Sequence, residues 1–204
     1  MSVIVAIKHE GVIYFGFDTS NLSSYSHHQI METNFPVFPL NEFPHALMGI
    51  ASSSAEQAIL KTTAPLVGEL EIIHKVINLK WVVRGLVPRI WQRLYEYEVL
   101  YMDRVGHPYL LPIIFAYQGD LYEINCDGYV QEISDYVVSS DMYSIDPALG
   151  VLSVSKNQDP KERILEALKA SKSTGYNVDA KAFIIINTKD MKYEYYNSEG
   201  VKEE

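Results

Sequence analysis

Cysteine is almost absent from this chain of 204 residues, and basic residues are scarce. The single cysteine, Cys126, excludes a disulfide within the chain and any cysteine-rich metal site. The 17 lysines and arginines are outnumbered by 26 aspartates and glutamates, which gives a formal net charge of −9. A general nucleic-acid binder needs a basic face, so we expect no nucleic-acid partner.

Long apolar runs are missing as well. No run reaches the roughly 18 residues of a membrane span, so no membrane partner is expected. The opening residues, MSVIVAIKHE, lack the basic segment that begins a secretory signal peptide. We therefore expect a cytoplasmic protein. No low-complexity linker divides the sequence, and a chain of this length can bury a substantial core, so we predict a single domain over residues 1–204.

Short apolar runs bounded by turn residues predict many strands. Val3–Ile7 and Val12–Phe17 flank a polar turn that ends in Gly11, as in a β-hairpin. Two prolines predict an irregular strand over Phe35–Leu40. Further strands are expected at Ala46–Ala51, Leu110–Tyr117, Leu121–Asn125, Tyr129–Ile133, Val137–Ser140, Ala182–Asn187 and Tyr193–Tyr196.

Two blocks of helical pattern separate these strands. In SSSAEQAILKT, Glu56 follows Ser53 by three residues, which is typical of a capping box. Apolar residues at three-to-four spacing predict a helix over Glu69–Asp103, kinked or divided at Pro88.

The second helical block follows the central strands. A small helix is expected around Tyr143–Leu152, and DPKERILEALKAS predicts a helix with Asp159 as its N-cap. Strict alternation of strands and helices is absent. Antiparallel or mixed sheets covered by helices are therefore favoured over a doubly wound parallel fold.

Four stretches of the sequence, taken in this order, resemble the proteasome β subunits and their bacterial ATP-dependent relatives, which belong to the N-terminal-nucleophile (Ntn) hydrolases. They are SVIVAIKHEGVIYFGFD, ALMGIASSSAEQAIL, LLPIIFAYQGDLYEINCDGYVQEISDYVVSSD and DPKERILEALKASKSTGYNVDAKAFIIINTK. The resemblance covers nearly the whole chain. It implies an α+β fold of the four-layer αββα type, with two mainly antiparallel sheets between helical layers.

The resemblance also implies a role for the start of the chain. The mature chains of this family begin with their nucleophile, and Ser2 takes that place once Met1 is removed. A free α-amine has a pKa of about 7.7–8.0 and can act as the base for its own hydroxyl. Asp18 corresponds to the family's aspartate at the end of the second strand. If Met1 is retained, the amine lies one residue too far out and this mechanism fails.

Position 34 departs from the family pattern. The family has a lysine at the start of the third strand, where Asn34 stands here without a charge. No lysine occurs between Lys8 and Lys61. This loss implies a weak or inactive site.

Three more residues correspond to parts of the family's site. Ser52 takes the place of the glycine of the oxyanion hole, where a backbone N–H can still donate. Ser140 matches a supporting serine. Thr174 falls in the family's Asp-x-x-Ser-Gly loop, in which Ser171 replaces the aspartate. Simpler interpretations exist for all of these residues: Ser52 as a helix cap, and Asp18, Ser140 and Thr174 as turn residues.

Three functional interpretations stay open at this point. The first is a proteasome-like homologue with a degenerate site, acting by self-assembly, as a ring by analogy, or by binding a peptide or an unfoldase. The second is an active N-terminal-serine amidohydrolase or peptidase that uses Ser2. The third is an unrelated α/β binding module. No cofactor is expected, and the adjacent His27 and His28 lack the spacing of a metal site.

Overall fold

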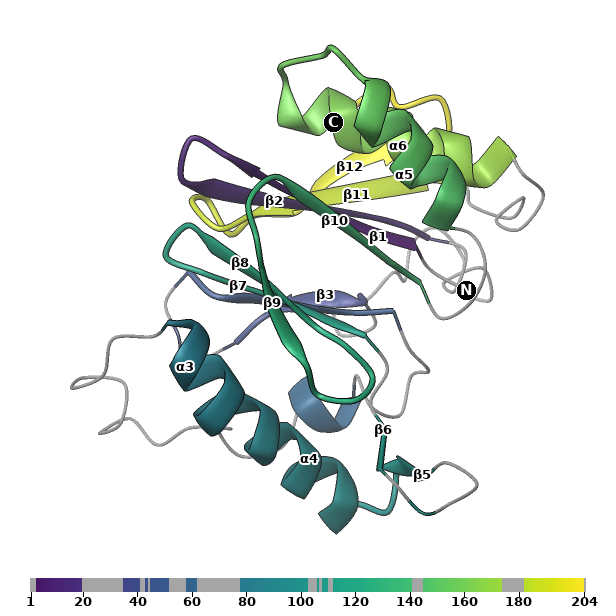
Figure 1. Ribbon diagram of the computed structural model, residues 1–204. Helices are drawn as coiled ribbons and strands as arrows, with labels where there is room; N and C mark the ends of the chain where they lie inside the picture. The colour runs from purple at the N-terminus through teal and green to yellow at the C-terminus, as the bar shows by residue number, and fades with distance from the viewer. Residues whose placement is uncertain are drawn as a thin grey trace.

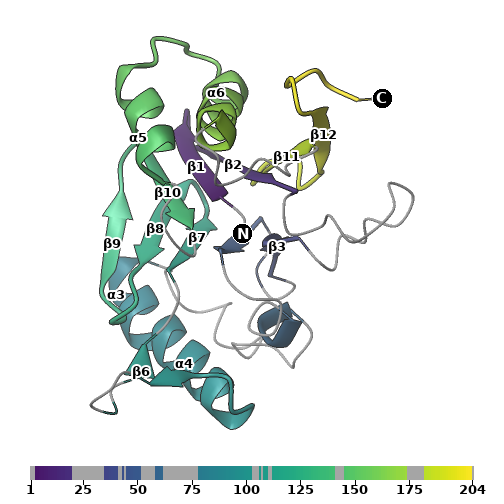
Figure 2. The same ribbon diagram turned by 90° about the vertical axis from the view of Figure 1, so that its right-hand side faces the viewer.

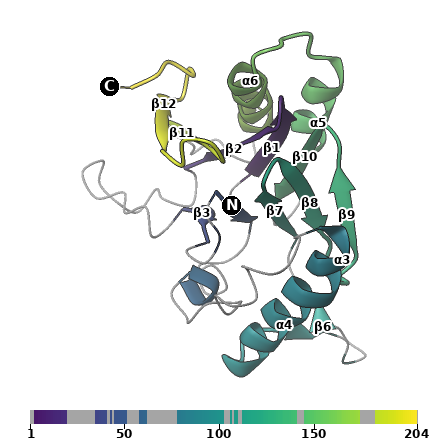
Figure 3. The ribbon, with the colours of Figure 1, turned by 90° about the vertical axis from the view of Figure 1, so that its left-hand side faces the viewer.

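The structure is a computed structural model that describes residues 3–19, 35–40, 43, 45–51, 58–61, 78–102, 106, 108–109, 112–140, 145–173 and 182–203. Two five-stranded sheets stack face to face (Figure 1). Helices cover the outer face of each sheet, and the views in Figures 2 and 3 place these helical layers on opposite sides of the sheet pair. The chain therefore has the four-layer αββα architecture that the resemblance implied.

The first sheet has the strand order β10-β1-β2-β11-β12. Its strands are β1 (Val3–His9), β2 (Val12–Asp18), β10 (Tyr136–Ser140), β11 (Ala182–Asn187) and β12 (Glu194–Asn197). All neighbouring pairs in it are antiparallel. The predicted opening hairpin is confirmed, and it turns through Glu10 and Gly11, whose φ angles are 48° and 76°. Two successive positive φ angles suit the twist of a two-residue hairpin turn.

The second sheet has the order β3-β4-β7-β8-β9. Its strands are β3 (Val37–Pro39), β4 (Leu47–Ile50), β7 (Ile113–Tyr117), β8 (Asp120–Ile124) and β9 (Val130–Ile133). β3 is short and lies at the edge, where its proline removes no ladder hydrogen bond that a central strand would need. A separate small ribbon pairs β5 (Tyr101–Met102) with β6 (Pro108–Tyr109).

Helices α5 (Ile145–Val154) and α6 (Pro160–Ser173) cover the first sheet. The predicted cap of α6 is present, because the backbone N–H of Lys161 donates to Oδ1 of Asp159 over 2.8 Å. α6 lies directly on β2. A Cβ added at Gly16 would be only 2.1 Å from Cγ2 of Ile164, so the absence of a side chain there permits the close approach.

The helix on the second sheet is not divided at Pro88, but its hydrogen-bonding pattern changes in the turn before this residue. It runs through α3 (Leu79–Trp81), a π-helical turn η3 (Val82–Leu86) and α4 (Val87–Glu96). Pro88 has no N–H, and its ring would collide with the carbonyl of Arg84 in a regular α-helix. The wider π turn before Pro88 relieves this collision.

The prediction that this helix continues to Asp103 is wrong. α4 ends at Glu96, and Glu98 adopts a left-handed φ of 57°. The N–H groups of Val99 and Leu100 then both donate to the carbonyl of Leu94, which turns the chain back before β5. The helical spacing of apolar residues in the sequence continues past the end of α4, because Val99 and Leu100 pack against the same core as the helix. The first part of that prediction, over residues 69–77, lies outside the described residues.

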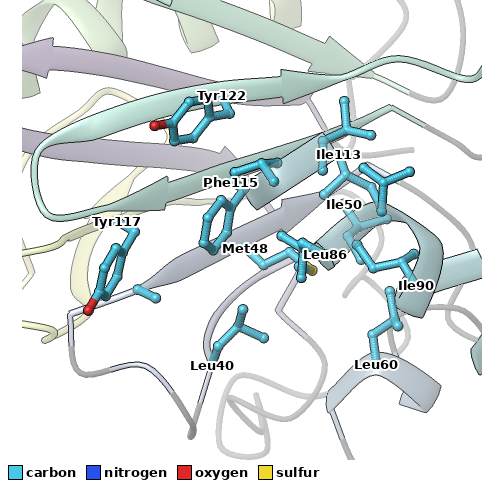
Figure 4. Close-up of a cluster of buried hydrophobic side chains, with 14 of the residues drawn as sticks. Leu40, Met48, Ile50, Leu60, Leu86, Ile90, Ile113, Phe115, Tyr117 and Tyr122 are labelled. Atoms are coloured by element: carbon cyan, nitrogen blue, oxygen red, sulfur yellow. The ribbon is translucent and has the colours of Figure 1, made fainter. Parts of the chain in front are cut away.

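Three apolar layers separate the four structural layers. Along β1, Ile4 and Ala6 face the other sheet, whereas Val3, Val5 and Ile7 face α5 and α6. This is the two-residue alternation of a strand buried on both faces. A third cluster fills the space between the second sheet and the α3–α4 helix, where Phe115, Met48 and Leu86 meet (Figure 4).

One end of the sandwich is closed by its hairpin turns. The Lys8 ammonium lies 3.2 Å from Oδ1 of Asp120, which joins β1 to β8 across the two sheets. A Cβ at Gly119 would lie 2.7 Å from the carbonyl oxygen of Gly11, so the two turns touch backbone to backbone. The beginning of β1 and the end of β2 therefore lie at the opposite end. Within the described residues, no helix is long and apolar enough to span a membrane.

Candidate functional site

Two of the predicted site residues, Asp18 and Ser140, lie at the end of the sandwich where β1 begins. Val3 pairs with Ser140 of β10 on one side, and the β1–β2 register ends at Ile4 with Phe17, one residue before Asp18. β1 is thus a central strand with a candidate residue on each neighbour. Ser2, the predicted nucleophile, lies outside the described residues but directly precedes Val3.

Asp18 holds the start of β1 through a buried hydrogen bond. Its side chain is 2% exposed. The backbone N–H of Val3 donates to its Oδ2 over 2.7 Å. A short bond between an amide N–H and a carboxylate is stronger than a bond between neutral groups. The carboxylate is thus buried and bonded to the residue that follows Ser2, which fits a structural role as well as a role in the site.

β10 ends with Ser139 and Ser140, which lie opposite the first two residues of β1. Ser140 is half-buried opposite Val3. Ser139, opposite Ile4, is 3% exposed, and its Oγ has no hydrogen-bond partner among the described residues. The structure therefore brings Asp18 and Ser140 together around Val3 from strands that are far apart in the sequence.

The remaining candidates are neighbours, in the sequence, of residues that the structure describes. Asn34, Ser52 and Thr174 lie outside the described residues, as Ser2 does. Asn34 precedes Phe35, whose ring contacts Phe17 at a centroid distance of 5.3 Å. Ser52 follows Ala51, one residue after β4, and Thr174 follows the last residue of α6.

The residue after Asp18 is bonded to the backbone of β11. Thr19 Oγ1 donates to the carbonyl of Ala182 and accepts from its N–H, each over 3.1 Å. On the second sheet, the Tyr193 hydroxyl donates to the carbonyl of Val37 over 3.0 Å. The ring of Tyr193 also packs edge-on against Phe35 at 4.8 Å. The Thr19 bonds lie within the first sheet, whereas Tyr193 connects the segment before β12 to the second sheet.

Lys61 is a charged residue that sequence reasoning did not place at this end. Residues 58–61 are helical, and the Lys61 ammonium donates to the carbonyl oxygen of Phe35, the residue after Asn34. It also lies 4.8 Å from the centroid of the Phe38 ring. Burial lowers the pKa of this amine to about 8. The only signal in the sequence was the absence of any nearer lysine, which does not reveal where Lys61 reaches.

Metal chemistry has no support in the part of the chain that the structure describes. No group of three histidine, cysteine, aspartate or glutamate side chains there could hold a metal ion. His27 and His28 lie outside the described residues. What this end does offer is a buried carboxylate, two serines and an amine with a lowered pKa, which are the side chains of hydroxyl and acid–base chemistry.

Comparison with known proteins supports the fold and identifies no family. No family model matches the sequence, and no curated protein matches it. Among solved structures, the chain is similar to the protein named BPH of Thiobacillus denitrificans, with a TM-score of 0.60 and 12% identity. The match covers 92% of this chain and 97% of that one. At so low an identity, the likeness shows that the αββα fold is shared over nearly the whole length.

Proposed function

We propose that this chain is a proteasome-like Ntn-hydrolase homologue with a degenerate active site, which acts by self-assembly or binding. The bond between the Val3 N–H and Asp18 carries the proposal. It supports an opening strand whose first residues are held in a fixed position, as the resemblance requires. The uncharged Asn34 supports the loss of activity, because a hydroxyl nucleophile without a nearby positive charge is poorly activated.

Self-assembly is tested by light scattering coupled to size-exclusion chromatography. A ring predicts a discrete mass that is a multiple of 23.2 kDa and that persists on dilution. Any assembly is expected to survive Ser2→Ala, because the degenerate interpretation gives this hydroxyl no role. A strict monomer at high concentration would count strongly against assembly and leave binding as the proposed activity.

A second candidate is an active N-terminal-serine amidohydrolase, and Lys61 is the specific observation that favours it. Its ammonium reaches the carbonyl of Phe35, next to the position where the family has its lysine. With a pKa of about 8, this amine is partly unprotonated near neutral pH. It could then assist the α-amine of Ser2 as a proton acceptor or supply charge as a cation.

The chemistry of that candidate is acyl transfer. The Ser2 hydroxyl adds to the carbonyl carbon of an amide, and its proton passes to an amine base. The protonated amine then delivers this proton to the leaving nitrogen as the C–N bond breaks. Water hydrolyses the resulting ester and regenerates Ser2.

One experiment separates the two candidates. Intact-mass measurement first determines whether Met1 is removed, and incubation with an acyl-trapping electrophile then tests Ser2. An adduct that is lost in Ser2→Ala and reduced at least about tenfold in Lys61→Met supports the hydrolase. Lys8→Met is the matched control, since Lys8 lies at the opposite end of the sandwich. Retained Met1 with no adduct removes the hydrolase.

A further inference from the structure

A separate cavity lies at the other end of β1, away from the candidate site. It has a volume of about 550 Å³ and is open to solvent. Its walls come from the end of β1, the β9–β10 turn, the end of α5 and the beginning of α6. The residues used below are His9, Asp135, Tyr136, Lys156, Asn157 and Arg163. β1 spans seven residues, so the cavity lies about 20 Å from Val3.

Arg163 is a partly buried cation with unused hydrogen-bonding capacity. Its side chain is only 15% exposed. Nη1 lies 3.3 Å from Oδ1 of Asp135, and Nη2 donates to the carbonyl of Leu152 over 3.4 Å. Both distances are long for hydrogen bonds that a guanidinium donates. Nε has no partner among the described residues, although arginine carries five N–H donors.

The ring of Tyr136 holds this guanidinium in place. The Arg163 Cζ atom lies 5.7 Å from the ring centroid, within the range of a cation–π contact. A fixed and incompletely paired cation is suited to an anion, because little side-chain order has to be gained on binding. Among the described residues that line the cavity, Asp135 is the one carboxylate.

The other polar groups of the wall add positive charge and donors. Lys156 is exposed and forms no ion pair with a described residue. His9 and Asn157 add an imidazole and an amide. Two nearby glutamates, Glu162 and Glu166, are bonded to Asn157 and Ser155. The described lining residues themselves include two cations, Lys156 and Arg163, and one carboxylate, Asp135.

We propose that this cavity binds the phosphate group of a small phosphorylated molecule, with Arg163 and Lys156 as its charged donors. Arginine and lysine both recognise phosphate oxygens, the first through paired N–H groups and the second as a point charge. The volume exceeds that of a bare phosphate ion and falls within the usual range for small-molecule sites. The same chemistry would accept free phosphate, and the probes below distinguish the two sources.

Isothermal titration calorimetry on the full chain tests the proposal. The probes are inorganic phosphate and glucose 6-phosphate, with glucose as the neutral control and ionic strength held constant with sodium chloride. Binding with a dissociation constant of about 1 mM or tighter is expected for at least one phosphate probe. Tighter binding of glucose 6-phosphate identifies a phosphorylated molecule as the ligand, and equal binding identifies the free anion.

Lys156→Met is the deciding variant because the Lys156 side chain is exposed and forms no hydrogen bond or ion pair with a described residue. Loss of one charged donor is expected to weaken phosphate binding by about tenfold. Lys189→Met removes an exposed lysine from the β11–β12 turn and should leave the affinity unchanged. Arg163→Gln should reduce binding further, with its folding checked by circular dichroism. No binding at about 20 mM phosphate, or equal affinity in Lys156→Met, overturns the proposal.

Discussion

Replacing Asp18 with alanine tests how firmly the start of β1 is held. The carboxylate is 2% exposed and accepts the N–H of Val3 over 2.7 Å. Alanine removes the acceptor and leaves a buried backbone donor unpaired. A hydrogen bond to a charged group contributes about 1.5–3 kcal/mol, and an unsatisfied buried donor carries a penalty of similar size. We expect Asp18→Ala to lower the free energy of unfolding by about 3 kcal/mol.

Two further variants make this expectation specific. Asp18→Asn keeps an oxygen acceptor in nearly the same position, so its cost should be about half as large. Asp127→Ala is the matched control, because Oδ1 of Asp127 also accepts a backbone N–H, that of Tyr129, over 2.9 Å. That bond is exposed, so water replaces it and the cost should be about 0.5 kcal/mol.

Urea denaturation monitored by circular dichroism measures the free energy of unfolding of all three variants at one pH. The three variants should rank in the order Asp18→Ala, Asp18→Asn, Asp127→Ala, with the first the most destabilised. Hydrogen exchange at Val3 should also accelerate in Asp18→Ala, because its donor is no longer protected. Equal costs for Asp18→Ala and Asp127→Ala would refute the reasoning, since burial is the feature that separates the two bonds.

Three other predictions concern packing and pH. Gly16→Ala should lower the free energy of unfolding, measured by urea denaturation, by about 2 kcal/mol or more, because its Cβ would lie 2.1 Å from Ile164. An unchanged stability would contradict the close packing of α6 on β2. Lys61→Met should raise stability by about 1 kcal/mol at pH 7. Its folded pKa of about 8 lies below the usual lysine value of 10.5. The cost of burying the charge is therefore present below pH 8 and should vanish above pH 10.5, and a difference in stability that does not depend on pH would argue against this origin. Burial raises the pKa of Glu194, but bonds from Lys161 and Tyr196 outweigh it and the net pKa is lowered. The stability that this lowered pKa provides is lost as pH falls through the folded pKa. Lys161→Met should therefore reduce the drop in melting temperature at acid pH. An unchanged drop would contradict the prediction.

Sequence reasoning succeeded where the determining interactions are local. The opening hairpin was predicted because its turn needs residues that tolerate positive φ, and Gly11 marks it. The start of α6 was predicted because an N-cap acts within one helical turn, between Asp159 and Lys161. The end of α4 was missed because Val99 and Leu100 continue the apolar pattern while the hydrogen-bonding pattern has already changed.

The candidate site was predicted only in part. The resemblance brought Asp18 and Ser140 to attention, and the strand order places them on either side of Val3. Lys61 was not assigned to this end, because its contact with Phe35 joins residues 26 positions apart. Four of the six predicted residues, Ser2, Asn34, Ser52 and Thr174, lie outside the described residues and stay predictions.

The sequence by itself determined the strands, turns and helix starts, because hydrophobic period, turn residues and caps act over a few positions. Tertiary structure alone decided that β1 is central, that the Asp18 carboxylate meets the Val3 N–H, and that Arg163 faces the same cavity as His9. The physical reason is that these contacts form between distant segments. They exist only when stacking of the two sheets and their helices compensates for the entropy of bringing those segments together.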